Sequence, residues 1–172
     1  MNPAFLQYRL HILGNINVFA VFGCLKSKIF RVEFHRAIIT IDMDPATARI
    51  LIVDDEPSLL KMMSVYLGRL GYAITTSNTT DRAWAELQAD PSAFSVAVLD
   101  ATMDGLSMED LALRALGASP KLCILAASGY PVDMTALEAA APGRVLLLHK
   151  PFTPEMLAAA VRRMLAAQEE EL

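Results

Sequence analysis

Five short runs rich in apolar residues divide the sequence after residue 48, and each run ends in polar or turn-forming residues. The runs cover residues 50–53, 72–77, 96–99, 121–126 and 144–149. The first and third are unbroken apolar stretches, which is typical of strands buried on both faces of a parallel sheet. The pattern therefore predicts five strands, most of them central rather than half exposed.

Amphipathic stretches alternate with these runs and predict five helices. The first helix begins at Pro57 and ends at Gly71, and its apolar stripe consists of Leu59, Leu60, Met63, Leu67 and Leu70. The second is predicted from a Thr80 cap through Gln88, and the fourth covers residues 134–141. Strands that alternate with helices indicate an α/β domain, with a five-stranded parallel sheet, helices on both faces and right-handed crossovers.

Capping signals mark the beginnings of the third and fifth helices. Ser107 and Asp110 have the spacing of a capping box, with Asp in place of the usual Glu. Thr153 and Pro154 predict the cap and first turn of the last helix. Its predicted inward face consists of Met156, Leu157, Ala160, Val161, Met164 and Leu165.

The charge distribution separates the first part of the chain from the rest. Residues 1–42 carry five basic and two acidic side chains, whereas the remainder carries ten and seventeen. This shift predicts a boundary near residue 45, with an N-terminal extension (1–45), a main domain (46–168) and an acidic tail (169–172) that frays in solvent. Apolar and polar residues alternate over residues 30–35, which is typical of a strand in an appended hairpin or a partner-binding arm. An alternative of equal weight is that translation starts at Met43, so that residues 1–42 are not made.

Composition excludes several classes of protein. The net charge is −4 and no basic helix is present, so we expect no direct nucleic-acid binding. The apolar stretch 17–25 is shorter than the roughly 20 residues of a spanning helix, and no signal peptide is recognisable, so we expect no membrane association. Cys24 and Cys123 show no metal-ligand spacing, which indicates reduced cysteines in a cytoplasmic protein.

Polar side chains stand where four of the predicted strands end. Asp54 and Asp55 follow the first strand, Asp100 the third, Ser128 the fourth and Lys150 the fifth. The carboxyl ends of parallel strands share one edge of the sheet, where ligands collect. Taken singly, each has an ordinary explanation as a cap, a turn residue or a solvated side chain. Four such coincidences at one edge favour a functional site.

The chemistry of these residues indicates a cation and a phosphoryl group. Three carboxylates and one lysine leave a net charge of −2, which a divalent cation neutralises. Oxygen ligands favour Mg²⁺ or Mn²⁺ over zinc. A carboxylate held beside such a cation can act as a nucleophile and accept a phosphoryl group. Ser128 and Lys150 can then donate hydrogen bonds to the phosphoryl oxygens.

These residues resemble the receiver domain of two-component response regulators, of a single-domain or hybrid-kinase-like type. The resemblance spans residues 49–167 and rests on the following motifs in order: Leu51-Ile-Val-Asp-Asp-Glu56, Val98-Leu-Asp100 with Met103, Ala127-Ser128-Gly129, and Lys150-Pro151-Phe152. It implies a flavodoxin-like doubly wound sheet with strand order 2-1-3-4-5. It also implies a Lys150–Pro151 bond that is often cis.

The resemblance also implies a role for each residue of the site. Asp100 is the expected phosphoacceptor, and the expected ligands of Mg²⁺ are Asp55, Asp100 and the backbone carbonyl of Thr102, with Asp54 assisting. Ser128 is the expected switch hydroxyl, and Lys150 the expected phosphate contact.

Three positions depart from the family pattern. Asp104-Gly105 stands where Pro-Gly is common, which predicts a more flexible loop with added negative charge. Leu147 replaces the aromatic switch residue, which weakens the expected coupling to Ser128. Tyr130 is bulky enough to hinder an attacking water, which predicts slow self-dephosphorylation.

The leading hypothesis is a phosphorelay response regulator, not an enzyme. It accepts a phosphoryl group from a histidine kinase or phosphotransfer protein and, with no output domain after residue 172, signals to a downstream protein by contact or relays its phosphate. The alternative is a degenerate receiver that acts as a phosphorylation-independent interaction module. An aspartate-nucleophile phosphatase is disfavoured because Thr102 stands where its second Asp would be. A flavodoxin-type module is disfavoured because the first loop is acidic.

Overall fold

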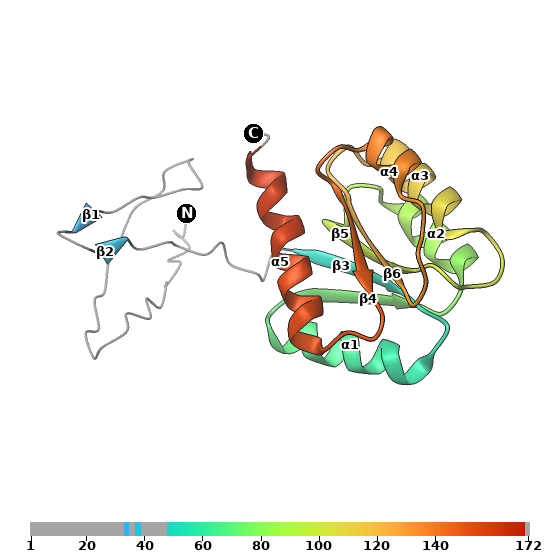
Figure 1. Cartoon of the computed structure of the whole chain (residues 1–172), viewed down its shortest axis with the longest axis horizontal. Helices are drawn as coiled ribbons and strands as arrows, with labels where there is room; N and C mark the ends of the chain where they lie inside the picture. The colour runs from blue at the N-terminus through green and yellow to red at the C-terminus, as the bar shows by residue number, and fades with distance from the viewer. Residues whose placement is uncertain (1–32, 35–36, 39–47, 171–172) are drawn as a thin grey trace, which may run out of the picture. The chain divides into compact units, whose positions relative to one another are not determined.

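The chain divides into two compact units, Met1–Met43 and Asp44–Leu172. The computed structural model describes residues 33–34, 37–38 and 48–170 (Figure 1). In the first unit, β1 (Glu33–Phe34) pairs antiparallel with β2 (Ala37–Ile38). Part of the strand expected over residues 30–35 is therefore present, and the rest of that prediction lies outside the described residues, as does Cys24.

The second unit is built on a five-stranded parallel sheet. Its strands are β3 (Arg49–Val53), β4 (Ala73–Ser77), β5 (Val96–Asp100), β6 (Cys123–Ser128) and β7 (Val145–His149). Their order across the sheet is β4-β3-β5-β6-β7, and all four neighbouring pairs are parallel. This order confirms the predicted 2-1-3-4-5 arrangement.

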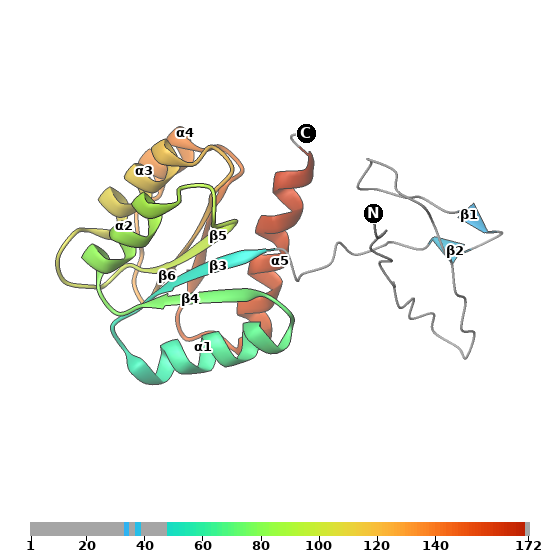
Figure 2. The same cartoon turned by 180° about the vertical axis from the view of Figure 1, so that it is seen from behind.

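Helices cover both faces of this sheet (Figures 1 and 2). They are α1 (Pro57–Arg69), α2 (Thr80–Ala89), α3 (Met108–Ala118), α4 (Thr135–Ala140) and α5 (Pro154–Glu170). The side chains of Ile50 and Ile52 pack in one core with α1 and α5, whereas those of Leu51 and Val53 pack in the other with α2, α3 and α4. The period-two alternation of a strand thus divides one apolar run between two cores.

Two of the predicted helix caps are present as expected. The Ser107 hydroxyl accepts a hydrogen bond from Asp110 N at 3.1 Å and donates to the Asp110 carboxylate at 2.7 Å. Thr153 Oγ1 accepts from Met156 N at 3.3 Å. The predicted cap of α2 was wrong by one residue, because Thr79 rather than Thr80 accepts the hydrogen bond from Arg82 N.

Other differences from the predictions lie at the ends of elements. β6 covers Cys123–Ser128 rather than 121–126, because it pairs in register with β5 as far as the pair formed by Asp100 and Ala127 and with β7 as far as Ser128. Met156 was assigned to the inward face of α5 but is 48% exposed, because the buried stripe of that helix is centred on Leu157, Ala158, Val161 and Met164. α5 continues to Glu170, past the predicted boundary at 168.

Candidate functional site

Parallel pairing brings the predicted carboxylates to one edge of the sheet. Asp54 directly follows β3, and Asp100 is the last residue of the adjacent β5. Each of Asp54, Asp55 and Asp100 offers a carboxylate oxygen, and these three oxygens lie within 4.8 Å of one another. Asp54 and Asp100 are buried, whereas Asp55 is exposed. The cluster is therefore anchored in the protein on one side and open to solvent on the other.

Lys150, which follows the edge strand β7, also contacts this cluster. Its Nζ lies 2.9 Å from Asp54 Oδ2 and 3.0 Å from Asp100 Oδ1. The side chain is 23% exposed, whereas the two carboxylate side chains are each 2% exposed. One ammonium group thus offsets the repulsion between two buried carboxylates.

The pKa of Lys150 reflects two opposing effects. Burial by itself lowers this pKa, because it disfavours the charged ammonium form. Hydrogen bonds from Lys150 to Asp54 and Asp100, together with the attraction of their charges, outweigh burial and raise the pKa above its ordinary value. Lys150 is consequently protonated, and so positively charged, at neutral pH.

Backbone and hydroxyl groups orient the two buried carboxylates. Asp54 Oδ1 accepts a hydrogen bond from Glu56 N at 2.9 Å. Asp100 Oδ2 accepts from the Thr102 hydroxyl at 2.9 Å, and Asp100 Oδ1 accepts from Thr102 N at 3.4 Å. The family resemblance implied a role only for the backbone carbonyl of Thr102, so this hydroxyl contact was not predicted. An Asp followed two residues later by a Thr in a loop is the local signal that pointed to it.

Ser128 lies at the same edge of the sheet, and its side chain is hydrogen-bonded to the loop that follows β6. It is 1% exposed, and its hydroxyl oxygen accepts a hydrogen bond from Tyr130 N at 3.1 Å. Its backbone carbonyl accepts from Lys150 N at 2.7 Å, which ties β6 to the segment carrying the lysine. The Lys150–Pro151 peptide bond is cis, as the resemblance implied.

The donor set fits a small, hard divalent cation. Three carboxylates supply oxygen ligands of the kind that Mg²⁺ and Mn²⁺ take, and the exposed side at Asp55 leaves space for water. With Lys150 included, the four side chains carry a net charge of −2 that such a cation neutralises. The geometry therefore supports a metal at this edge, next to a carboxylate that can act as a nucleophile.

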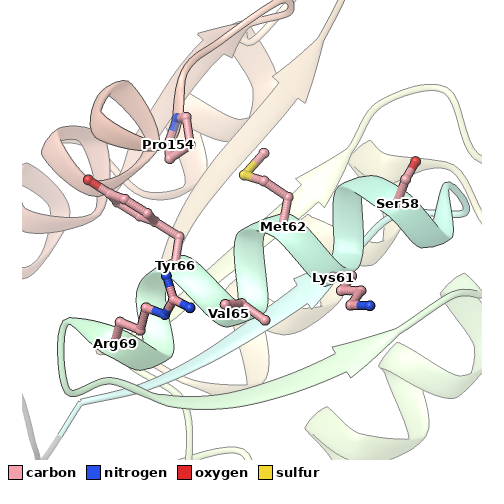
Figure 3. A pocket seen from close by; sticks show the side chains of 7 residues that line it. All are labelled: Ser58, Lys61, Met62, Val65, Tyr66, Arg69 and Pro154. Atoms are coloured by element: carbon pink, nitrogen blue, oxygen red, sulfur yellow. The ribbon is translucent and has the colours of Figure 1, made fainter.

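A separate open groove lies on the surface of α1 (Figure 3). It is lined by Ser58, Lys61, Met62, Val65, Tyr66 and Arg69 of α1, and by Pro154 at the start of α5. The Tyr66 hydroxyl hydrogen-bonds to Glu155 at 3.4 Å and so links the two helices. The groove shares no residue with the carboxylate cluster, so it is a candidate contact surface rather than part of the chemical site.

Comparison with known proteins assigns the family. The sequence model of the response regulator receiver domain matches residues 50–162, which is more than half of the chain, so this chain belongs to that family. Receiver domains of this family are signalling modules. The chain is 34% identical over 135 residues to the DNA-binding response regulator MtrA of Mycolicibacterium smegmatis, covering 75% of this chain and 55% of MtrA.

A second relative and a solved structure match over nearly their whole length. The chain is 29% identical over 119 residues to the response regulator receiver protein CpdR of Brucella abortus, covering 69% of this chain and 98% of CpdR. The CheY-like receiver domain protein of Methanospirillum hungatei superposes with a TM-score of 0.65 at 25% identity, covering 73% of this chain and 98% of that chain. The chain thus spans about half the length of MtrA but almost all of CpdR. Among residues 48–170, none of the helices combines the length and apolarity that crossing a membrane requires.

Proposed function

We propose that this protein is a phosphoacceptor response regulator that receives a phosphoryl group on Asp100. The observation that carries the proposal is the cluster of Asp54, Asp55 and Asp100 within 4.8 Å, with Lys150 bound to two of the three. Membership of the receiver family supports the same interpretation. Under this proposal, residues 46–168 form the receiver, and residues 1–45 and 169–172 are appendages to it.

Each residue of the cluster has a distinct role in the proposed reaction. An Asp100 carboxylate oxygen attacks the phosphorus of the donor, a P–O bond to Asp100 forms, and the bond from phosphorus to the donor's leaving group breaks. Asp54, Asp55 and Asp100, together with the Thr102 carbonyl, would hold Mg²⁺ or Mn²⁺, which supplies charge neutralisation for the phosphoryl oxygens. Lys150, whose Nζ lies 3.0 Å from Asp100 Oδ1, would donate to the incoming phosphoryl group, and Ser128 would act as the switch hydroxyl.

The proposed switch gives the hydroxyl proton of Ser128 a new acceptor. Its hydroxyl oxygen accepts a hydrogen bond from Tyr130 N, and a phosphoryl oxygen on Asp100 would offer a charged acceptor to the hydroxyl proton. Movement of Ser128 would shift the β6–α4 loop and bias the neighbouring surface between two states. Leu147 packs in the core with α4, so the shift would act on an aliphatic side chain rather than on an aromatic ring.

We infer that the phosphoryl donor is a histidine kinase or phosphotransfer protein in the cytoplasm, and that output passes through contact with another protein. The groove on α1 supports a contact with another protein, because it combines an exposed apolar side chain, Val65 at 44%, with the basic residues Lys61 and Arg69. Such a surface complements an amphipathic segment with acidic flanks. The Val65→Lys variant should lose transfer from the protein donor while retaining transfer from a small-molecule donor.

The decisive experiment is phosphorylation by acetyl phosphate with and without Mg²⁺, measured by intact mass. Wild type should gain a single phosphoryl adduct that depends on Mg²⁺, and Asp100→Asn should gain none. Asp104→Asn is the matched control, because Asp104 is an exposed acid of the same loop that lies outside the cluster. Absence of an adduct under conditions where Mg²⁺ binds would overturn the proposal in favour of a phosphorylation-independent interaction module.

A further inference from the structure

The hydroxyl group of Thr80 makes a contact that its position in α2 does not require. Thr80 is 3% exposed, and it is the first residue of the helix rather than its cap. Its Oγ1 accepts a hydrogen bond from Leu106 N at 3.1 Å and lies 3.5 Å from Asp104 O, to which it donates. Both partners belong to the loop between β5 and α3, which begins directly after Asp100.

Gly105 lies between those two partners and leaves room for the Thr80 hydroxyl. A Cβ atom added at Gly105 would stand 3.0 Å from Thr80 Oγ1, which is closer than side chains normally pack. Gly105 also has a φ of +96°, in the region that favours glycine. The loop and the threonine thus fit together by shape as well as by hydrogen bonding.

The segment that carries Thr80 also contacts the other half of the acidic cluster. Asp54 N donates to Ser77 O at 3.2 Å, and Ser77 Oγ donates to Thr79 O at 2.8 Å. Residues 77–80 therefore contact both the backbone that carries Asp54 and the loop that follows Asp100. Direct pairing of β3 with β5 sets the spacing of the two acidic segments, and Thr80 adds a side-chain contact to the loop that follows Asp100.

We propose that Thr80 is a positioning residue for the metal and phosphoacceptor site. By fixing the backbone of residues 104–106, its hydroxyl sets the path of the loop that carries Thr102 and so the placement of the Thr102 groups around Asp100. Residues 101–107 contain no proline, so the loop lacks the fixed φ that a proline ring imposes. The cross-element hydrogen bonds of Thr80 supply the restraint instead.

The inference rests on the proposed function for its consequence in phosphorylation, but it has a direct physical readout. Thr80→Val has nearly the same shape as wild type and removes only the hydroxyl. We expect it to weaken Mg²⁺ binding about fivefold, the size of one lost hydrogen bond, and to slow phosphorylation of Asp100 by a similar factor. Thr80→Ser keeps the hydroxyl and should restore both.

The matched control is Thr79→Ala, which removes the cap of the same helix without touching the loop. Mg²⁺ affinity is measured by calorimetric titration of the full chain. The Leu106 amide is followed by hydrogen exchange, and urea unfolding monitors the fold. Thr80→Val should speed exchange at Leu106 about tenfold, whereas Thr79→Ala should lower stability but leave that amide and the Mg²⁺ affinity unchanged.

The outcomes separate this inference from the proposed function. Calorimetry and hydrogen exchange need no phosphoryl transfer, so weaker Mg²⁺ binding in Thr80→Val supports the positioning role even if Asp100 takes no phosphoryl group. Unchanged Mg²⁺ affinity in Thr80→Val, or an equal loss in Thr79→Ala, would overturn it, because the threonine would then serve only the stability of α2. If Thr80→Val does not fold, Thr80→Ser must still match wild type in both readouts for the role of the hydroxyl to stand.

Discussion

The ammonium group of Lys150 lies 2.9 Å from the Asp54 carboxylate, although 96 residues separate the two in the chain. Lys150 follows β7 at one edge of the sheet, whereas Asp54 follows β3, with β5 and β6 between them. The lysine side chain must therefore reach across the ends of two strands. This ion pair, together with the contact to Asp100, holds the acidic edge of the domain together.

Removal of the lysine should make the fold depend on a cation. Lys150→Met leaves two buried carboxylates without a counter-charge, and we expect it to lower the free energy of unfolding at neutral pH in EDTA by about 2 kcal/mol. This is less than the loss of roughly 3–5 kcal/mol for a fully buried pair, because Lys150 is 23% exposed. Saturating Mg²⁺ should recover more stability in this variant than in wild type, as measured by urea unfolding. Equal Mg²⁺ effects in both proteins would contradict the role assigned to the lysine.

The same ion pair predicts a dependence of stability on alkaline pH. Because the folded protein holds the pKa of Lys150 above its ordinary value of 10.5, the pair contributes stability that is fully present below that value. The contribution is lost as the pH rises through the higher pKa of the folded state. The stability difference between wild type and Lys150→Met in EDTA should thus be constant from neutral pH to about pH 9.5 and shrink above about pH 10.5. Denaturant unfolding across this range tests it, and a difference that grows with pH would contradict it.

Neutralising the proposed phosphoacceptor should separate metal binding from folding. Asp100→Asn removes one charge from the cluster but keeps an oxygen acceptor for Thr102, so the metal-free protein should unfold at the same or a higher urea concentration than wild type. Its Mg²⁺ dissociation constant should rise by about tenfold or more, because loss of a metal ligand, or of a group that orients one, weakens metal affinity by at least this factor. Asp104→Asn should leave Mg²⁺ affinity within about twofold of wild type, because surface charges outside the cluster are screened. Equal affinities for Asp100→Asn and wild type would place the metal elsewhere.

A methyl group at Gly105 should be costly for a reason specific to this loop. Gly105→Ala forces a side chain into a positive φ and against Thr80 Oγ1, and we expect a loss of about 1–3 kcal/mol of stability. Gly117→Ala is the control, because Gly117 lies in α3 with no atom within 4 Å of the added Cβ, and it should stabilise the helix by up to about 1 kcal/mol. Thermal unfolding of the two variants should therefore shift in opposite directions. If Gly105→Ala left the unfolding temperature unchanged, the loop would have to accommodate the methyl group without strain.

The lifetime of the proposed phosphoryl group should depend on the ring of Tyr130. Tyr130 is 71% exposed and follows Ser128 by two residues, so its truncation should not disturb the fold. Tyr130→Ala is expected to shorten the lifetime several-fold by opening a path for water, whereas Tyr130→Phe keeps the ring and should match wild type. Decay of the adduct after removal of acetyl phosphate, followed by intact mass, measures it. A lifetime unchanged or longer in Tyr130→Ala would rule out the shielding role.

Much of the fold followed from the sequence because its signals are local. Continuous apolar runs such as residues 50–53 and 96–99 are buried on both faces whichever neighbours they have, so they predicted central strands. The positions of Asp54, Asp100 and Lys150 at strand ends then followed from the general rule that parallel strands end at one edge. Helix and strand ends were predicted less accurately. β6 shifted by two residues because its limits are set by pairing with β5 and β7, which no local pattern encodes.

The succession of strands and helices along the chain could thus be predicted from local patterns, whereas the residues at the acidic edge and the family required short motifs combined with the rule that parallel strands end at one edge. Which of those residues are in contact became clear only from the folded structure. It placed Lys150 between Asp54 and Asp100, turned Met156 outward, and took Thr80 from an expected cap to a contact with the loop after Asp100. These are distances between segments remote in the chain, and they are fixed only when the sheet and both helical layers pack together.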